Sequence, residues 1–165
     1  MSVKKIAILF SGSGSNMEAI IRKVHGKKAG KNRIEVALLI CNKKDAYGIE
    51  RAKNLGFETM IIEHSKYASR DGFDSELVRA IKAANIDLVV LAGFMRILSP
   101  YFVEAYRHRI LNIHPSLLPS FGGAHAHRDV LAYGTKVSGC TIHFVDEGMD
   151  HGPIILQDTV PVLDD

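Results

Sequence analysis

Short apolar runs separated by amphipathic segments constrain the fold of this chain more than any other feature of its sequence. Most of the runs are continuous rather than alternating, which is typical of strands buried on both faces of a parallel sheet. The segments between them repeat apolar residues at helical spacing, as Phe73, Leu77, Val78 and Ile81 do. The predicted strands of this series cover Ile6–Phe10, Ile34–Ile40, Glu58–Ile62, Asp87–Ala92 and Ile110–His114.

Helices are predicted between these strands, and the order of the elements indicates the fold class. Ser15 or Asn16 is expected to cap the first helix, and Pro100 suits the first turn of a later one. The predicted helices cover Met17–Val24, Ala46–Leu55, a longer segment opened by Ser69 or Asp71, a segment opened by Ser99, and His125–Tyr133. Two strands, Val137–Val145 and Ile154–Val162, end the series. This alternation predicts an α/β fold that is Rossmann-like, with a mostly parallel central sheet, helices on both faces and a C-terminal strand pair.

Length and composition place the chain among ordinary globular proteins. It has 165 residues, 47% of them hydrophobic and 24% charged, with a formal net charge of +3. These values exclude the disordered, collagen-like and disulfide-rich classes. The basic stretch Arg22–Arg33 has no interleaved aromatic residues, so it predicts a solvated loop rather than a nucleic-acid site.

The two cysteines and the N-terminal residues indicate the cellular compartment. Cys41 and Cys140 lie in separate apolar runs and predict buried free thiols, which suits a reducing environment. The first apolar run is too short for a signal peptide or a membrane span. We therefore expect a cytoplasmic protein that binds neither membrane nor nucleic acid.

Glycine and serine dominate the segment after the first predicted strand, Ser11-Gly12-Ser13-Gly14-Ser15-Asn16. In open α/β sheets, ligands bind beyond the carboxyl ends of the strands. Glycines let the backbone approach a ligand closely, and the N–H groups at the start of a helix attract an anion. The segment is neither a Walker loop nor a complete GxGxxG motif, since position 17 is Met. Two readings stay open here, a phosphate site or a tight strand–helix turn.

A second candidate segment, Gly93–Leu98, follows the fourth predicted strand and reads GFMRIL. An apolar segment with one Arg at this place suits a pocket for a flat ligand that carries an acid group. The alternative is a lead-in to the next helix that packs on the core. The residues alone do not separate the two.

Asn112 and His114 stand two residues apart at the end of the fifth predicted strand. Residues at this spacing share one face of a strand. An amide can donate to an oxygen that gains charge in a transition state, and an imidazole can move protons near neutral pH. The pair is therefore suited to attack on a carbonyl, although a lone His is more often structural.

The loop between the last two predicted strands holds three carboxylates, Asp146, Glu147 and Asp150. Such residues are usually solvated, but one of them beside His114 would favour the charged imidazolium. The spacing does not say which. No metal is predicted, because His125 and His127 stand at i, i+2 without a nearby Cys or a third obvious ligand. No covalent nucleophile is predicted either, since no GxSxG motif is present.

Four motifs in this order are similar to those of one enzyme family. They read FSGSGSN, VVLAGFMRILSP, LNIHPSLLPSF with HAHR, and HFVDEGMDHGPIILQ. Together they resemble the phosphoribosylglycinamide formyltransferases, a folate-dependent formyltransferase family, from about residue 4 to the last residue. The resemblance implies an enzyme of de novo purine biosynthesis. It would transfer the formyl group of its cosubstrate 10-formyltetrahydrofolate to the amine of glycinamide ribonucleotide, with small-molecule partners only, as a monomer or homodimer.

The same resemblance implies roles for individual residues. Asn112 contacts the formyl oxygen, His114 is the catalytic acid, and Asp150 keeps that histidine charged. The residues that match the phosphate-binding loop are Gly14, Ser15 and Asn16. The residues that match the folate site are Arg70, Met95, Arg96, Ile97, Leu98, Asn112, Asp146, Glu147, Gly148, Met149 and Asp150.

Three features depart from the family's pattern. Gly122-Gly123 and His151 replace residues that relatives usually carry. We expect the glycines to loosen the loop before His125, and His151 to alter its own loop while leaving Asp150 intact. The resemblance also predicts further residues after Asp165. We therefore expect a single formyltransferase domain over residues 1–165 that lacks the family's C-terminal tail.

Other functions stay open at this point. The alternatives are formyltetrahydrofolate deformylase or another formyltransferase, and a non-catalytic binder of folate or nucleotide. Other formyltransferases usually carry a further domain and lack a GSGSN-type loop, and the deformylase resembles a chain with an added N-terminal domain. Binding without turnover would identify the non-catalytic binder.

Overall fold

The computed structural model describes residues 2–163, which fall into two compact units, Met1–Ile110 and Leu111–Asp165. The first, unit 1, contains β1 (Ser2–Phe10), α1 (Ser15–Val24), β2 (Lys28–Ala29), β3 (Asn32–Cys41), α2 (Tyr47–Asn54), β4 (Met60–Ile61), the 3-10 helix η1 (His64–Lys66), α3 (Arg70–Ala83), β5 (Leu88–Leu91) and α4 (Pro100–Ala105). The second, unit 2, contains nearly all of β6 (Ile110–His114), followed by α5 (Ala126–Tyr133), β7 (Val137–Phe144) and β8 (Ile154–Pro161).

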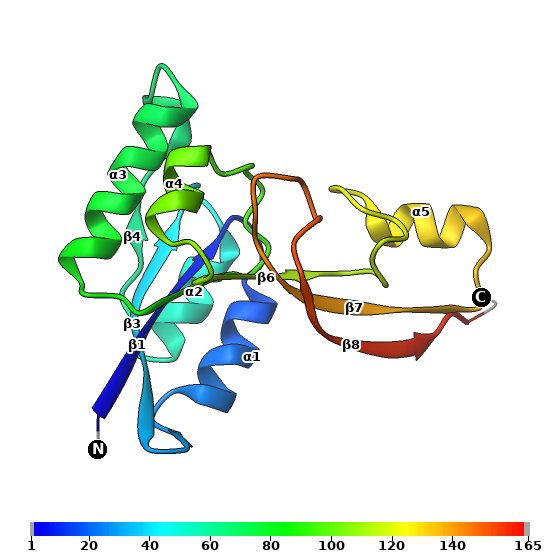
Figure 1. The fold of residues 1–165 in the computed structure, drawn as a ribbon, viewed down its shortest axis with the longest axis horizontal. Coiled ribbons are helices and arrows are strands. Elements are labelled where there is room, and N and C mark those ends of the chain that lie inside the picture. The colour runs from blue at the N-terminus through cyan, green and yellow to red at the C-terminus, as the bar shows by residue number, and fades with distance from the viewer. Residues whose placement is uncertain (1, 164–165) are drawn as a thin grey trace. The chain divides into compact units, whose positions relative to one another are not determined.

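The strands of unit 1 form a mostly parallel sheet. β1 pairs in parallel with β3 on one side and with β5 on the other, and β4 pairs in parallel with β3. Only β2 runs antiparallel, as a short hairpin onto β3. Figure 1 shows α1 and α2 on one side of these strands and α3 with α4 on the other. The predicted fold class, a Rossmann-like mostly parallel sheet with helices on both faces, is confirmed.

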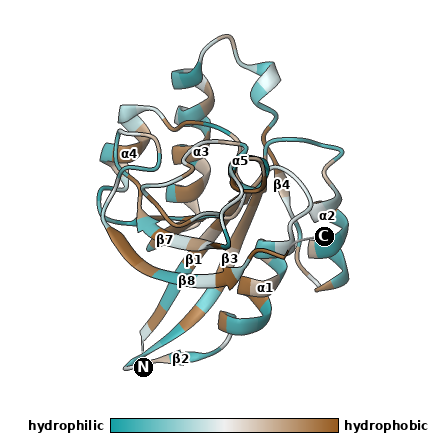
Figure 2. Ribbon diagram, turned by 90° about the vertical axis from the view of Figure 1, so that its right-hand side faces the viewer, coloured by the Kyte–Doolittle hydropathy of each residue, from teal (hydrophilic) through white to brown (hydrophobic). Residues whose placement is uncertain are grey.

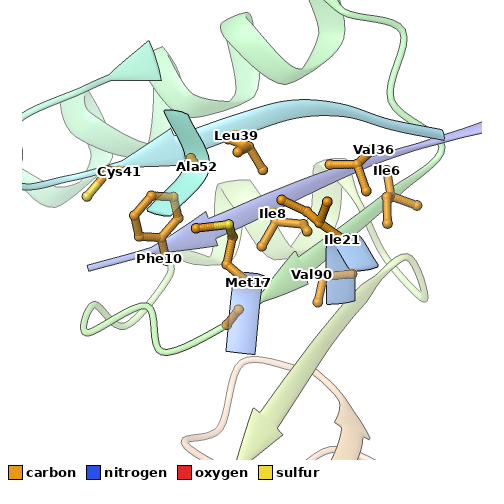
Figure 3. Packing of buried hydrophobic residues seen from close by; sticks show 11 residues of the cluster. Ile6, Ile8, Phe10, Met17, Ile21, Val36, Leu39, Cys41, Ala52 and Val90 are labelled. Carbon is orange, nitrogen blue, oxygen red and sulfur yellow. The ribbon is translucent and has the colours of Figure 1, made fainter. Parts of the chain in front are cut away.

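Alternate residues of the central strand pack into the main apolar cluster of unit 1. Ile6, Ile8 and Phe10 of β1 meet Met17 and Ile21 of α1 there, as Figure 3 shows. All five side chains are buried, and α1 turns its polar side to solvent (Figure 2). The continuous apolar run of β1 is thus explained, since its other residues are buried on the opposite face. This packing fixes the carboxyl end of β1, where the glycine-rich segment begins.

Element boundaries differ from the sequence-based predictions at a few places. The expectation that Ser15 or Asn16 caps α1 is wrong, because Gly14 occupies the cap position with a left-handed backbone and no side chain caps the helix. A glycine adopts that conformation without strain, so the backbone turn replaces the side-chain cap. The basic stretch contains β2 in place of a simple loop, and β4 is shorter than the predicted Glu58–Ile62.

Unit 2 is built on an antiparallel strand ribbon followed by an exposed edge strand. β6 pairs antiparallel with β7, and β7 pairs antiparallel with β8. The predicted C-terminal strand pair is therefore confirmed. In the β6–β7 register Asn112 lies opposite His143, and His114 lies opposite Thr141. Because side chains of directly opposed residues share a face, these four form one patch on the ribbon.

Two features bear on the expected cellular compartment: the state of the two cysteines and the character of the helices. Cys41 is a buried free thiol, as predicted, whereas Cys140 is a free thiol that is only half-buried. Burial raises the pKa of the Cys41 thiol, despite its hydrogen bond to the carbonyl of Lys43. In the described part of the chain, no helix has the length and apolar character needed to cross a membrane.

Candidate functional site

The glycine-rich segment after β1 borders a hollow in unit 1. The hollow has a volume of about 190 Å³. It is lined by Ser11, Gly12, Ser13, Gly14, Ser15, Asn16, Lys43, Ala92, Gly93 and Met95. All three residues predicted to bind phosphate therefore lie on one hollow, at the start of α1. The lining also contains Lys43, a cation that the sequence analysis did not single out.

Two helix starts meet at this hollow with no space between their backbones. A Cβ atom on Gly14 would lie 2.6 Å from the Cα of Gly48, which is in the first turn of α2. A Cβ on Gly48 would lie 2.6 Å from the Phe10 ring and 2.9 Å from the Gly12 carbonyl oxygen. The Gly48 N–H donates to that carbonyl over 3.0 Å. Gly48 therefore holds the glycine-rich segment directly and leaves no room for a side chain.

Gly48→Ala is expected to destabilise the chain by about 1–3 kcal/mol, because the added methyl group overpacks a rigid contact. It should also weaken binding of a phosphate-bearing ligand, since the Gly12 carbonyl has to move. Urea unfolding and titration with a ribonucleotide measure the two effects. Gly122→Ala is the matched control, since a Cβ there meets nothing nearer than 3.8 Å. Equal losses in the two variants would contradict the steric argument.

The segment predicted to clasp the folate ring leaves β5 beside the glycine-rich segment. The Met95 N–H donates to the Ser11 hydroxyl over 2.8 Å, and the Ser11 N–H donates to the Gly93 carbonyl over 3.1 Å. Met95 and Ile97 are large apolar side chains that are 61% and 53% exposed. Exposed apolar groups on a segment with a fixed backbone suit contact with an apolar ligand.

A buried carboxylate fixes the far end of this segment. Asp74 of α3 is fully buried, and one of its oxygens accepts the N–H of Ser99, the residue that caps α4. Its other oxygen has no hydrogen-bond partner among the described residues. Burial raises the pKa of Asp74 above the ordinary value near 3.8, although its bonds with Ser99 and the charge of Arg70 oppose the rise. Arg70, the predicted folate contact, is the exposed first residue of the same helix.

Asp74→Asn is expected to remove a pH dependence of stability. The raised folded-state pKa means that folded protein binds this proton more tightly than unfolded protein. Stability from Asp74 is therefore present at low pH and falls as pH rises from about 3.8 through the folded-state pKa. Asparagine keeps an acceptor for Ser99 but binds no proton. Urea unfolding of both proteins across this pH range should show their difference shifting in favour of the variant as pH rises, and a constant difference would contradict the assignment.

The predicted catalytic residues of unit 2 are brought together on the β6–β7 ribbon and the loop after it. His114 is buried, and its Nδ1 lies 3.4 Å from Oδ2 of Asp150. Asn112 is half-buried on the same face, two residues before His114. The sequence left open which carboxylate of the loop approaches His114, and the structure places Asp150 there.

The proline-containing segment after β6 folds back over His114. The Nε2 atom of His114 lies 2.9 Å from the carbonyl oxygen of Phe121, which also accepts from the Ser116 hydroxyl. A carbonyl only accepts, so Nε2 of His114 carries a proton. With Asp150 at Nδ1, both ring nitrogens face acceptors, an arrangement that the imidazolium satisfies at both positions.

Thr141 and Gln157 attach the same segment to the strands beneath it. The Thr141 hydroxyl donates to the Ser116 carbonyl over 2.7 Å and accepts the Leu118 N–H over 3.0 Å. The Gln157 amide donates to the Leu118 carbonyl over 2.9 Å. These three hydrogen bonds fix a segment that two prolines keep out of regular structure.

Asp150 itself is held by a backbone N–H of the segment that follows β6. Its Oδ2 accepts the N–H of Gly123 over 2.8 Å. Asp150 has φ of 53° and Gly123 has φ of 93°, both in the left-handed region. Aspartate tolerates that region better than most residues, and glycine enters it freely.

His151 pairs with the first carboxylate of the loop. Its Nδ1 lies 3.2 Å from Oδ2 of Asp146, and Oδ1 of Asp146 accepts the Gly148 N–H over 2.9 Å. Burial alone would raise the pKa of Asp146, but the bonds from His151 and Gly148 outweigh it and hold that pKa below its ordinary value. The predicted folate residues Glu147, Gly148 and Met149 are exposed in this turn.

One residue that sequence reasoning missed lies at the centre of the patch. His143 of β7 is 1% exposed, and its Nε2 is 3.1 Å from the amide nitrogen of Asn112 and 3.8 Å from Oδ1 of Asp150. His143 stands two residues after Thr141 in β7, and the two-residue period of a strand puts both side chains on one face. The β6–β7 register, which sets these two residues opposite Asn112 and His114, could not be predicted from the sequence.

Within residues 2–163, no three His, Cys, Asp or Glu side chains gather closely enough to hold a metal ion. The pair His125 and His127 lies at the start of α5.

Comparison with known proteins gives consistent similarities over almost the whole chain. Residues 4–165 match the family described as formyl transferase. The chain is 48% identical to phosphoribosylglycinamide formyltransferase of Escherichia coli over 158 residues, covering 96% of this chain and 73% of that protein. It is 39% identical to the protein of the same name from Bacillus subtilis, covering 97% of this chain and 80% of that one.

A longer relative and a solved structure extend these similarities. The chain is 48% identical to the trifunctional purine biosynthetic protein adenosine-3 of Drosophila melanogaster over 162 residues, but spans only 12% of that protein's length. The crystal structure of phosphoribosylglycinamide formyltransferase from Campylobacter jejuni superposes with a TM-score of 0.91 at 49% identity, covering 96% of this chain and 83% of that one.

Proposed function

This chain belongs to the formyl transferase family, and from that premise we propose that it transfers the formyl group of 10-formyltetrahydrofolate to the amine of glycinamide ribonucleotide. The observation that carries the proposal is the contact between His114 and Asp150, beside Asn112 on the same strand face. Formyl transfer requires three groups: an acid, a carboxylate that favours the charged form of that acid, and an amide donor.

The reaction needs no enzyme nucleophile. The substrate amine attacks the formyl carbon, a new C–N bond forms, and the formyl oxygen becomes an oxyanion. The Asn112 N–H and protonated His114 stabilise that charge. The intermediate collapses by breaking the bond to the folate N10, which takes a proton as it leaves, while the new amide nitrogen loses one. His114 assists this proton transfer, and Asp150 holds it in the charged form.

The protonation of His114 identifies the nitrogen that acts. Nε2 donates to the Phe121 carbonyl, so the mobile proton is the one at Nδ1, on the side of Asp150. Asp150 is in turn fixed by the Gly123 N–H. Binding both substrates supplies much of the rate, because a bimolecular reaction becomes a reaction within one complex.

Unit 1 supplies binding groups in the same proposal. Gly14, Ser15 and Asn16 hold the ribonucleotide phosphate through N–H groups at the start of α1, and Lys43 adds a positive charge on the same hollow. The segment Met95–Leu98 with Arg70 contacts the folate. In unit 2, the turn Asp146–Asp150 contributes further folate contacts.

The experiment that tests the proposal measures formyl transfer by the 165-residue chain with both substrates. Formylated ribonucleotide and tetrahydrofolate should appear in equal amounts. Omitting the ribonucleotide separates the deformylase alternative, which would release formate without an acceptor. Binding of both ligands without product would favour the non-catalytic binder and count against the proposal.

The remaining expectations about partners are part of this proposal. Small molecules are the substrates, and neither nucleic acid nor membrane is a partner. The monomer or homodimer state stays a prediction that sedimentation of the chain can decide.

A further inference from the structure

His143 is built into the patch in a way that the roles of Asn112, His114 and Asp150 do not explain. It lies directly opposite Asn112 in the β6–β7 register, and Asn112 is half-buried while His143 is 1% exposed. The amide is therefore more accessible to a ligand than the imidazole that it contacts. Any effect of His143 on the reaction passes through its neighbours.

The hydrogen bonds of His143 define one protonation state of its ring. Nδ1 lies 2.9 Å from the carbonyl oxygen of Phe144, and Nε2 lies 3.1 Å from the amide nitrogen of Asn112. The carbonyl only accepts, so Nδ1 carries a proton. The amide nitrogen only donates, so Nε2 is bare. Both contacts are satisfied together by the neutral Nδ1–H tautomer.

This state fixes the amide of Asn112. One of its two N–H bonds is taken by Nε2 of His143, which sets the plane of the amide group. The direction of the second N–H then follows from the plane of the amide group. A doubly protonated ring would instead turn the amide oxygen toward Nε2 and reverse the positions of donor and acceptor.

We propose that His143 is a positioning residue that holds the Asn112 amide with its free N–H directed at the formyl oxygen. The inference rests on the proposed formyl transfer. It assigns the buried imidazole a task in the transition state, where a preoriented donor acts without reorganisation. Oδ1 of Asp150, at 3.8 Å from Nε2, is a charged group near the ring.

Two substitutions separate orientation from packing. His143→Gln places an amide oxygen near the position of Nε2 and keeps an acceptor for Asn112, whereas His143→Leu fills similar space and removes it. We expect kcat to fall roughly tenfold in the Leu variant, in line with one lost hydrogen bond, and to recover largely in the Gln variant. The KM for 10-formyltetrahydrofolate should change little. In an Asn112→Ala background, His143→Leu should cause no further loss.

Two controls accompany these variants. His108→Gln, at an exposed position in unit 1, should match the parent protein. Equal kcat in the parent and the Leu variant, or equal losses in the Gln and Leu variants, would overturn the inference.

Nitrogen NMR of the parent protein measures the protonation state of the His143 ring without any need for turnover. The His143 ring should show a protonated Nδ1 and a bare Nε2, and one side-chain proton of Asn112 should exchange slowly. A protonated Nε2 would overturn the inference. An inactive parent chain counts against the proposed function alone, because the tautomer is still measured. If the Leu variant does not fold, the NMR result decides.

Discussion

His114→Ala is expected to reduce kcat for formyl transfer by about 10²- to 10⁴-fold, the range that a positioned general acid contributes. The proton at Nδ1 is the one that reaches the departing folate nitrogen, and alanine has none to give. Binding should be much less affected, because the phosphate and folate contacts of unit 1 are elsewhere in the chain. Steady-state kinetics with each substrate varied in turn would show kcat falling and both KM values nearly constant.

Folding has to be checked in this variant, since His114 is buried and has partners on both nitrogens. Alanine leaves the Phe121 carbonyl with only its Ser116 donor. His114→Gln fills more of the space and serves as a second variant, and exposed His108→Gln is the matched control. A folded His114→Ala protein with a parent-like kcat would remove His114 from the mechanism.

Much of the fold could be predicted because burial on two faces leaves a plain signal. The apolar runs of β1, β3, β5 and β6 mark their strands, and helical spacing marks α3, whose four predicted core residues are all buried. β2 was not predicted, because both of its residues are exposed and lie in a basic stretch. A two-residue exposed strand has no apolar face to produce a period.

The site was predictable in its parts but not in its contacts. Asn112 and His114 share a face by strand period alone, and a ligand place after β1 follows from the fold class. The choice of Asp150 over Asp146 could not be read, because it depends on a left-handed turn at Asp150 and a bond from Gly123. Asp146 is used otherwise, in its pair with His151.

His143 and Asp74 escaped for a shared reason. Each is a buried polar residue whose partner lies far away in the chain, Asn112 for His143 and Ser99 for Asp74. A buried polar residue signals that a partner exists, but strand register and helix packing decide which one. That information is tertiary, so one sequence does not contain it in readable form.

Asn112→Ala is expected to lower kcat by about 10²- to 10³-fold, the loss typical of removing one oxyanion donor. Asn112→Asp sharpens the test, because aspartate has nearly the same shape but only accepts hydrogen bonds. If Asn112 acts by donating an N–H to the developing oxyanion, the Asp variant should be at least as slow as the Ala variant. A carboxylate facing that oxygen repels its negative charge, so the similar shape of aspartate does not restore the rate.

Loss of the Asn112 amide should change kcat and leave KM nearly unchanged. Both Asn112 variants should keep the KM for 10-formyltetrahydrofolate, since the ground-state formyl oxygen carries little charge. Their rates should stay low across the pH range in which the parent is active, because neither alanine nor an ionised aspartate supplies an N–H donor there. An Asp variant faster than the Ala variant would show that shape, not the N–H donor, is what the strand supplies at this position. If kcat falls equally in the Ala and Asp variants, the Asn112 amide acts as the hydrogen-bond donor beside the acid His114.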